Sequence, residues 1–175
     1  HRETGKTVAL DLGLINFITT DDGTRFHHPK PYKTAKEKLA QKQRRLSAKQ
    51  KGSKNSRKLR TEIARQHRRV SNIRSDFQWK VAKQLSIEND TIIIEKLNIK
   101  SMLENKSYEV SNINISDASW GSFIEKLKCK AESAGVRVVE VDPRNTSKTC
   151  SKCLEVNKDL TLQDRMFRCL ACGET

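Results

Sequence analysis

The sequence has few aromatic side chains and no long apolar run. Aromatic residues make up 5% of its 175 residues, which is thin for a β-sandwich or for a large apolar ligand pocket. No apolar run approaches the roughly 18 residues that a membrane-spanning helix needs, and residues 1–5 contain no apolar segment of the kind found in a secretory signal. We therefore expect neither a membrane protein nor a secreted scaffold built on disulfides.

Positive charge is what the sequence has in excess. It contains 35 Lys and Arg against 21 Asp and Glu, which gives a formal net charge of +14 at pH 7. Hydrophobic residues make up 35% of the chain and charged residues 32%. The chain can therefore bury one modest core, with room for a small satellite module.

The excess charge lies in one segment, residues 33–83. This segment holds 18 basic and three acidic residues, whereas the rest of the chain is close to neutral. A charge run is usually a solvated helix face, but so many cations repel one another unless a polyanion supplies countercharge. We therefore favour contact with nucleic acid over a merely solvated face. The candidate contacts are Lys42, Arg44, Arg45, Lys54, Arg57, Lys58, Arg68 and Arg69.

The pattern near the start of the chain indicates three β-strands. Two apolar runs, residues 7–10 and 16–20, are followed by the turn signal Asp21-Asp22-Gly23-Thr24 and by a third strand from Arg25. Asp-Gly between strand-like runs is typical of a hairpin turn. The sequence predicts a three-stranded meander here.

The hydrophobic period becomes helical from about Ala35. A polar stretch, residues 51–56, separates two basic helices, with Ser56 as the candidate N-cap of the second. Spacings of three and four residues place one apolar stripe on that second helix. The stripe consists of Leu59, Ile63, Gln66, Val70, Ile73, Phe77 and Val81. We expect an antiparallel helical hairpin over residues 33–88, with the stripe buried and the outside cationic.

The following segments predict a strand, a helix and a strand in that order. Residues 91–94 are apolar and β-branched, as in a strand buried on both faces. Ser116 and Asp117 suggest the start of a helix over residues 120–134, and residues 136–141 form the next strand-like run. This order favours a right-handed crossover and an α/β fold, with a mixed sheet covered by helices.

Two Cys-x-x-Cys pairs stand close together in the last part of the sequence. Cys150 and Cys153 form the first pair and Cys169 and Cys172 the second, with 15 residues between the pairs. Four thiolates in two such knuckles suit one structural zinc ion, with no open position for catalysis. Two disulfides would need an oxidising compartment, which nothing else in the sequence supports. We therefore expect one zinc ion, and we expect the odd thiol, Cys129, to be a small packing residue in a helix.

Asp11 and Glu95 each end an apolar strand. If the two strands are neighbours in the sheet, both carboxylates lie at one edge of it. Mg²⁺ takes oxygen ligands of this kind, and a two-metal site can clamp the attacking and leaving oxygens of a phosphodiester. An acid at a strand end is also a common turn former or helix cap. The spacing alone leaves both interpretations open.

Several segments together resemble the TnpB (OrfB) family, the RNA-guided DNA nucleases encoded by insertion-sequence transposons, which are related to type V CRISPR effectors. The similar segments follow the family's order and are residues 8–14, 92–98, 116–121, 146–153 and 157–162, followed by Asp164 and Arg165. The resemblance covers essentially the whole chain. The blocks are specific in combination, although no single one would be.

The resemblance implies an RNase H-like RuvC nuclease core over residues 1–145, including the hairpin of residues 33–88, and a zinc ribbon over residues 146–175. It implies that Asp11 and Glu95 are the first two ligands of catalytic Mg²⁺ or Mn²⁺. It also implies a DNA target and a guide RNA as partners, with the basic hairpin facing the guide–target heteroduplex or the DNA. In such systems pairing with the guide reads the sequence while the protein recognises backbone shape. The implied location is the prokaryotic cytoplasm, at the nucleoid.

The sequence departs from this family in two ways. The family's third catalytic carboxylate follows the second zinc knuckle, and here three residues follow Cys172. The amino-terminal domains that hold the guide RNA and read the target-adjacent motif are missing too. Asp142 ends a strand but precedes the ribbon, so we expect a structural role for it. We expect a fragment with little or no cleavage of its own, and the alternative is a non-catalytic module in which the basic helices and the ribbon bind nucleic acid.

Overall fold

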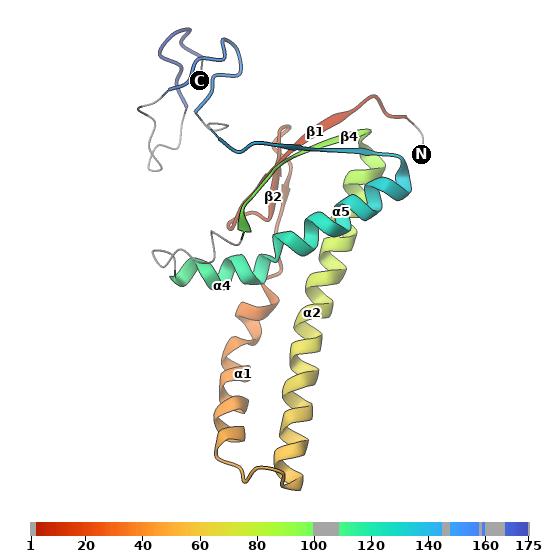
Figure 1. The fold of residues 1–175 in the computed structure, drawn as a ribbon, viewed down its shortest axis with the longest axis vertical. Coiled ribbons are helices and arrows are strands. Elements are labelled where there is room, and N and C mark those ends of the chain that lie inside the picture. The colour runs from red at the N-terminus through yellow and green to blue at the C-terminus, as the bar shows by residue number, and fades with distance from the viewer. Residues whose placement is uncertain (1–2, 100–108, 145–147, 158, 160–166, 175) are drawn as a thin grey trace.

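A mixed β-sheet and a long helical hairpin dominate the fold (Figure 1). The computed structural model describes residues 3–99, 109–144, 148–157, 159 and 167–174, with only the backbone of residues 109–113. The strands are β1 (Thr7–Leu12), β2 (Ile18–Thr20), β3 (Arg25–Phe26), β4 (Thr91–Glu95) and β5 (Arg137–Val141). The helices are α1 (Pro31–Ser47), α2 (Lys54–Glu88), α4 (Glu109–Ala118) and α5 (Trp120–Ala134).

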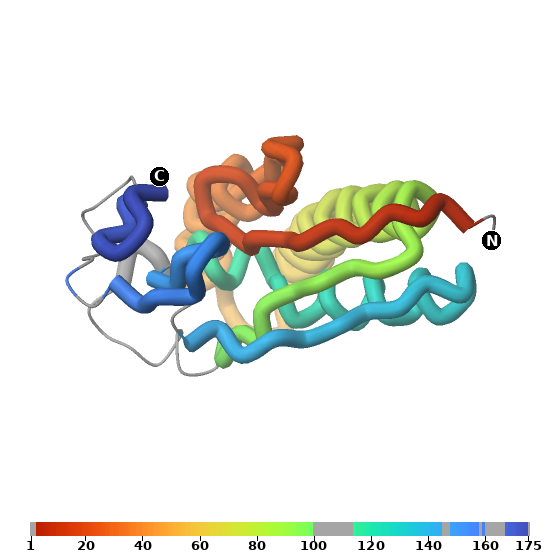
Figure 2. The backbone as a smooth tube through the Cα atoms, turned by 90° about the horizontal axis from the view of Figure 1, so that it is seen from above, coloured from red at the N-terminus to blue at the C-terminus, as the bar shows by residue number. Residues whose placement is uncertain are grey.

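The sheet has the order β3-β2-β1-β4-β5. Strands β1, β2 and β3 pair antiparallel, which confirms the predicted meander. Strand β4 pairs parallel with β1 on one side and with β5 on the other, so the two strands that end in Asp11 and Glu95 are neighbours. Figure 2 shows β1, β4 and β5 side by side, with the blue carboxyl-terminal segment beyond the carboxyl ends of these strands. The predicted α/β class with a mixed sheet is confirmed.

The two faces of the sheet differ in burial. Val8 and Leu10 of β1 and Ile92 and Ile94 of β4 are buried against helices. Because side chains alternate along a strand, the residues between them point to the other face, and Ile93 there is only half-buried. The predicted burial of this strand on both faces is therefore wrong: in the described part of the chain, α2 and α5 both lie on one side.

Helices α2 and α5 form the layer that covers the sheet. Val81 and Leu85 of α2 join Phe123 and Leu127 of α5 in one core cluster with the buried strand residues. Leu127 has no exposed surface, and a Leu→Ala change at such a site costs about 3 kcal/mol. This layer holds β1 and β4 in register and thereby fixes where the two strands end.

Helices α1 and α2 form the predicted antiparallel hairpin, which extends away from the sheet (Figure 1). At 35 residues, α2 is about 52 Å long. Ala35 and Leu39 of α1 pack against Val70 of α2. The stripe on α2 is buried or half-buried at six of its seven positions, and the exception is Ile73, which is 41% exposed.

Helix α2 begins earlier than the sequence predicts. Its N-cap is Ser53, whose hydroxyl oxygen accepts a hydrogen bond from the backbone N–H of Ser56 at 3.2 Å. Ser56 lies inside the first turn, so the prediction that Ser56 is the N-cap is wrong. Both serines fit a capping pattern. Gly52 adopts a φ of +81°, and this turn places the next residue, Ser53, at the start of the helix.

The bounds of α5 agree with the prediction, but Ser116 and Asp117 do not begin this helix. Ser116 and Asp117 lie in the last turn of α4, and the chain bends at Ser119, with φ of +54°, before α5 begins. Helix α5 ends at Gly135, which adopts the left-handed conformation common after helices. Cys129 is exposed on α5, so its expected packing role is wrong.

No helix in the described residues combines the length and the apolar character needed to cross a membrane.

Candidate functional site

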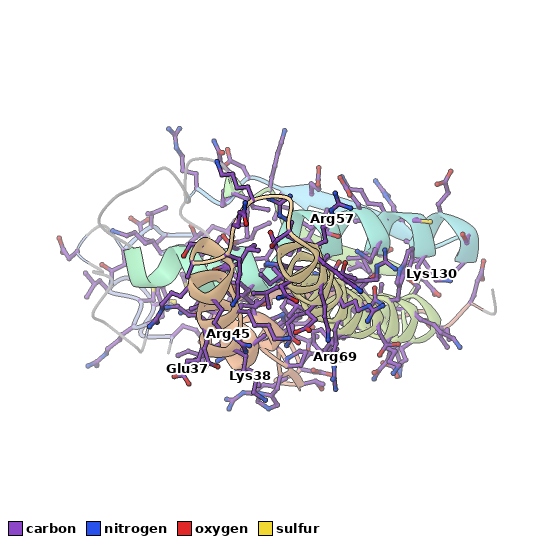
Figure 3. All side chains as sticks on the ribbon, turned by 90° about the horizontal axis from the view of Figure 1, so that it is seen from below. Glu37, Lys38, Arg45, Arg57, Arg69 and Lys130 are labelled. Atoms are coloured by element: carbon purple, nitrogen blue, oxygen red, sulfur yellow. The ribbon has the colours of Figure 1, made fainter. Side chains whose placement is uncertain are left out.

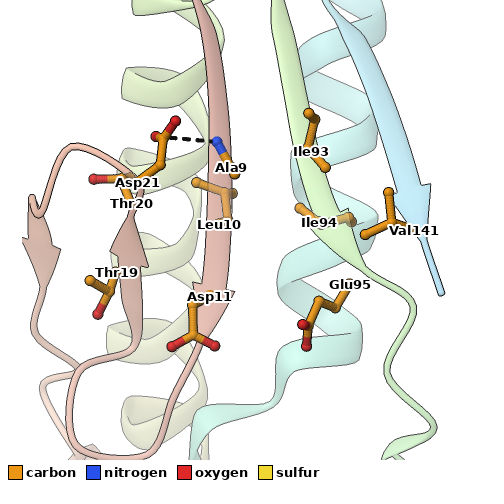
Figure 4. A pocket seen from close by; sticks show the side chains of 10 residues that line it. All are labelled: Ala9, Leu10, Asp11, Thr19, Thr20, Asp21, Ile93, Ile94, Glu95 and Val141. Atoms are coloured by element: carbon orange, nitrogen blue, oxygen red, sulfur yellow. Dashed lines mark hydrogen bonds between the residues drawn. The ribbon is translucent and has the colours of Figure 1, made fainter. Parts of the chain in front are cut away.

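Asp11 and Glu95 lie at the carboxyl ends of β1 and β4 (Figure 4). The register pairs Leu10 with Ile94, one residue before the two acids. The acids therefore come next to each other across a parallel pair, and strand alternation places both on the face that carries no helix in the described residues. The structure thus brings together the two carboxylates that the sequence singled out.

The two acids line one open pocket of about 310 Å³. Its floor is the uncovered face of the sheet, with Ala9, Ile93 and Val141 among the lining residues. Asp11 is exposed and Glu95 half-buried. A ligand can therefore reach both carboxylates without any movement of the sheet.

The electrostatics of the pocket favour a bound cation. Burial raises the pKa of the Asp11 carboxyl, and the negative charge of Glu95 raises it further. Two like charges at one site disfavour the ionised form of each other. A divalent cation between them would remove this repulsion, which is the arrangement that carboxylate ligands of Mg²⁺ require.

Asp21 is an acid in the same pocket that sequence reasoning took only as a turn residue. Its Oδ1 accepts a hydrogen bond from the backbone N–H of Ala9 at 3.3 Å (Figure 4). This bond ties the turn after β2 to β1 and directs the Asp21 carboxylate away from the strand ends. Among the described residues, the carboxylates of Asp11, Glu95 and Asp21 do not form a close three-ligand group.

The four predicted cysteines converge. Their Sγ atoms all lie within 4.8 Å of one another. The Cys150–Cys172 and Cys153–Cys169 sulfur pairs are each 3.5 Å apart. Zinc–sulfur bonds of about 2.3 Å in a tetrahedron place sulfurs roughly 3.8 Å apart, so these thiols fit one zinc ion.

The two knuckles repeat one backbone pattern. Leu154 N–H donates to the Cys150 carbonyl and Gly173 N–H to the Cys169 carbonyl, each at 3.0 Å. Leu154 and Gly173 both have positive φ, of +62° and +75°. This conformation is costly for leucine, and it indicates that the knuckle imposes the turn.

Backbone N–H groups prepare the thiols for a metal. The N–H of Cys172 lies 3.5 Å from the Cys169 sulfur, and backbone donors, led by this one, lower the pKa of Cys169 to about 6. The backbone N–H of Cys153 leads a similar group that lowers the pKa of Cys150. Because thiolates are the form that binds zinc, these donors favour metal binding by Cys150 and Cys169. Backbone donors also act on Cys153 and Cys172, but burial and hydrogen bonds with the neighbouring sulfurs outweigh them and raise the pKa of both thiols in the metal-free protein.

The hairpin carries the eight cations that the sequence singled out. Lys42 is half-buried, and its Nζ lies 3.4 Å from the Glu62 carboxylate on the facing helix. The other seven are exposed, as Figure 3 shows for Arg45, Arg57 and Arg69. The outside of the hairpin is therefore available to a polyanion, while Lys42 also supports the contact between α1 and α2.

Asp117 is a structural residue that sequence reasoning misassigned. Its carboxylate is buried and accepts hydrogen bonds from the backbone N–H groups of Tyr32 and Lys33 at the start of α1. The Arg74 guanidinium of α2 lies 2.8 Å from it. One side chain thus caps α1 and joins three helices at the base of the hairpin. No local sequence signal predicts this role.

Asp142 follows β5, and its Oδ1 accepts a hydrogen bond from the backbone N–H of Arg144 at 2.9 Å. This contact stabilises the turn after the strand, as expected for a structural residue.

Comparison with protein-family models shows to which family the chain belongs. The OrfB_IS605 family model, described as "Probable transposase", matches residues 1–106. The chain belongs to this family. The model of the "Cas12f1-like, TNB domain" matches residues 120–175, which contain α5, β5 and the four clustered cysteines. Membership of the OrfB_IS605 family confirms the resemblance drawn from the sequence blocks.

Two similar proteins carry the name "Putative RNA-guided DNA endonuclease". One, from Streptomyces pristinaespiralis, is 34% identical over 171 residues, which are 97% of this chain and 42% of that protein. The other, InsQ from Escherichia coli K12, is 33% identical over an alignment of 174 residues that covers 93% of this chain and 43% of that protein. This OrfB_IS605 member therefore spans less than half the length of these curated relatives.

A solved structure shares the fold. The cryo-EM structure of a "Cas12f1-sgRNA-target DNA complex" superposes with a TM-score of 0.59 at 20% sequence identity. The match covers 95% of this chain and 45% of that one. At this sequence identity the similarity establishes the fold of the OrfB_IS605 chain only. Its chemistry has to be argued from its own residues.

Proposed function

We propose that this chain is the RNase H-like RuvC nuclease domain of an RNA-guided DNA endonuclease, with a zinc ribbon at its end. The domain would hydrolyse phosphodiester bonds in target DNA that pairs with a guide RNA. Asp11 and Glu95 would hold catalytic Mg²⁺ or Mn²⁺. We place the nuclease core at residues 1–145 and the ribbon at residues 146–175.

The placement of Asp11 and Glu95 carries this proposal. They lie at the ends of neighbouring parallel strands, on the uncovered face of the sheet and in one pocket. Clusters of accessible carboxylates at the carboxyl ends of strands are suited to hard divalent cations.

The chain's own residues contribute position and charge to the reaction. The pairing of β1 with β4 fixes the two carboxylates before any substrate arrives, so little reorganisation accompanies metal binding. Bound Mg²⁺ supplies charge stabilisation for a phosphodiester and an activated water. Without the cation, both carboxylates repel a DNA phosphate. A third acidic ligand would come from another part of the protein.

The remaining features would hold the nucleic acids. Two knuckles that fit one zinc ion would stabilise the ribbon, which has too few residues for a core of its own. The exposed cations of the hairpin would contact the phosphates of the guide–target heteroduplex or of the DNA. The similar Cas12f1 structure is a complex of that protein with sgRNA and target DNA, and its likeness in fold supports an RNA and a DNA as partners here.

Cleavage by single variants tests the proposal. Asp11→Ala and Glu95→Ala should each abolish cutting of target DNA by a full-length protein that carries this chain, loaded with its guide RNA in Mg²⁺ or Mn²⁺. Binding of the same DNA, measured without added divalent metal, should stay within a few-fold of the parent, since neither side chain attracts phosphate without metal.

A variant that cuts at the parent rate would overturn the catalytic assignment. The chain would then be a non-catalytic module in which the basic hairpin and the ribbon bind nucleic acid. The isolated 175-residue chain should show little or no cleavage under the proposal, because two carboxylates hold a pair of metal ions poorly.

A further inference from the structure

A tryptophan on the outer side of the helical layer is surrounded by lysines. Trp79 of α2 is half-buried. The Nζ atoms of Lys126 and Lys130 of α5 lie 5.8 and 5.4 Å from the centre of its ring. These distances are within the range of cation–π attraction, so the indole holds two ammonium groups near one spot on the surface.

Further charges surround the same ring. Lys80 and Lys83 line a shallow pocket of about 270 Å³ together with Asp76, Trp79 and Lys130. We call Trp79, Lys80, Lys83, Lys126 and Lys130 the Trp79 patch. Asp76, which lines this pocket, is paired with Lys80 at 2.7 Å.

The lysines of the patch differ in how many hydrogen bonds and ion pairs they form within the protein. The Lys126 ammonium donates to Gln78 Oε1 at 3.1 Å and to the hydroxyl of Ser122, so its position is fixed. Lys83 and Lys130 have no ion-pair partner in the described part of the chain. Their positive charge is therefore available to an anion from outside.

The Trp79 patch lies on the opposite layer from the carboxylates. Asp11 and Glu95 lie on the uncovered face of the sheet, whereas the patch lies on α2 and α5, which cover the other face. Figure 3 shows Lys130 beside α5 and apart from Arg45 and Arg57 near the hairpin tip. A strand held at the patch is therefore separated by the sheet from the proposed cleavage site.

We propose that the Trp79 patch binds the phosphate backbone of the RNA partner, along the groove between α2 and α5. This inference rests on the proposed function, because it assumes that the protein works with an RNA. The DNA strand that is cut must reach the uncovered face, and the sheet separates that face from the patch. We therefore assign the patch to the RNA, which is not cut.

The chemistry of the patch suits a backbone contact without sequence reading. Lysine ammonium groups neutralise phosphates as point charges, and the release of counterions makes such binding weaken as salt rises. Lys126, already held by Gln78 and Ser122, would keep the indole and its neighbours in place.

The double variant Lys83→Gln/Lys130→Gln tests the proposal in the full-length protein. The probe is the RNA that co-purifies with the parent protein, transcribed in vitro. We expect weaker RNA binding, with the slope of log affinity against log salt less steep by about 2, one for each lost contact. Trp79→Phe, which keeps an aromatic ring but weakens the cation–π contacts, should reduce RNA affinity about threefold.

Controls separate this proposal from the proposed nuclease function. Lys6→Gln/Arg25→Gln removes the same charge from exposed positions outside the patch and should leave the salt slope as in the parent. Once saturated with RNA, the Lys83→Gln/Lys130→Gln complex should cut DNA at the parent rate, because the variant leaves Asp11 and Glu95 intact. An unchanged RNA affinity would overturn the patch as an RNA site. An unchanged RNA affinity with weaker DNA binding by the loaded complex would assign the patch to DNA instead.

Discussion

The four cysteines come from one short stretch, residues 150–172, whereas Asp11 and Glu95 lie on either side of the whole helical hairpin in the sequence. In the ribbon, each knuckle sets its own sulfur positions through local backbone hydrogen bonds. At the sheet edge, the two acids meet only because β1 and β4 pair in parallel. Local geometry therefore prepares the first site, and the global fold prepares the second.

This difference implies that the two sites respond to different perturbations. Loss of zinc should affect the ribbon alone, because none of the ribbon residues that the structure describes belongs to the core cluster under the sheet. A change that disturbs the packing of helices on the sheet should affect the carboxylates and leave the zinc in place. The predictions below test this independence and are ordered by expected effect.

Removal of zinc should produce the largest effect. Structural zinc sites contribute about 10 kcal/mol or more to the folding of small modules, so chelation or Cys150→Ser should unfold the ribbon. Hydrogen exchange should show lost protection of ribbon amides, while amides of β1 and β4 keep theirs. Cys129→Ser, at the exposed cysteine of α5, is the matched control and should retain one zinc per chain. Zinc well below one per chain in the parent would contradict the assignment.

Asp117→Ala should destabilise the base of the hairpin by about 3 kcal/mol, because it leaves the Arg74 guanidinium without its buried partner. Chemical denaturation measures this change, and zinc content should stay the same. Asp76→Ala removes the same charge from an exposed pair with Lys80 and should cost less than about 1 kcal/mol. Equal losses of unfolding free energy in the two variants would show that the buried Asp117–Arg74 pair stabilises the protein no more than an exposed ion pair does.

Neutralising the hairpin should change nucleic-acid affinity more than stability. Replacing Arg44, Arg45, Arg68 and Arg69 by Gln should make the slope of log affinity against log salt less steep by about 4. The control replaces the same four residues by Lys, which keeps the charge and should keep the slope. Filter binding at several salt concentrations gives the comparison. A slope like the parent's in the Gln variant would place the binding surface elsewhere.

Glu95→Gln should lower the pKa of Asp11, which is the smallest effect predicted here. Burial raises this pKa first and the charge of Glu95 adds to it, so without that charge the pKa should fall but stay above that of an ordinary aspartate. NMR titration of the Asp11 carboxyl carbon in metal-free protein measures the change. An Asp11 pKa that is the same in both proteins would mean that the two carboxylates are too far apart to share a cation.

Sequence reasoning performed best where structure is local. The bounds of α5, the meander and the cysteine pairs follow from periodicity, turn residues and spacing, each of which operates within a few residues. The choice of Ser53 over Ser56 as a cap was missed because two nearby serines fit one pattern and the turn at Gly52 decides between them.

Long-range packing explains what sequence reasoning could not find. Asp117 caps α1 from the end of a distant helix, so no neighbouring residue signals its role. The half-buried state of Ile93 depends on which face of the sheet the helices cover. The strand ends suggested that Asp11 and Glu95 meet only if β1 and β4 are neighbours, which local sequence does not decide. Their role as metal ligands came from the family resemblance and stays a prediction.

The measurement that tests the central claim most directly is the cleavage rate of two charge-matched variants, Asp11→Asn and Asp21→Asn. Both acids line the same pocket, and both variants remove one negative charge without changing side-chain shape. Asp21→Asn keeps an oxygen that can accept the hydrogen bond from Ala9 and should cut guide-matched DNA near the parent rate. Asp11→Asn should bind that DNA but not cut it. Equal cleavage by the two variants would contradict the assignment of the metal site to Asp11 and Glu95.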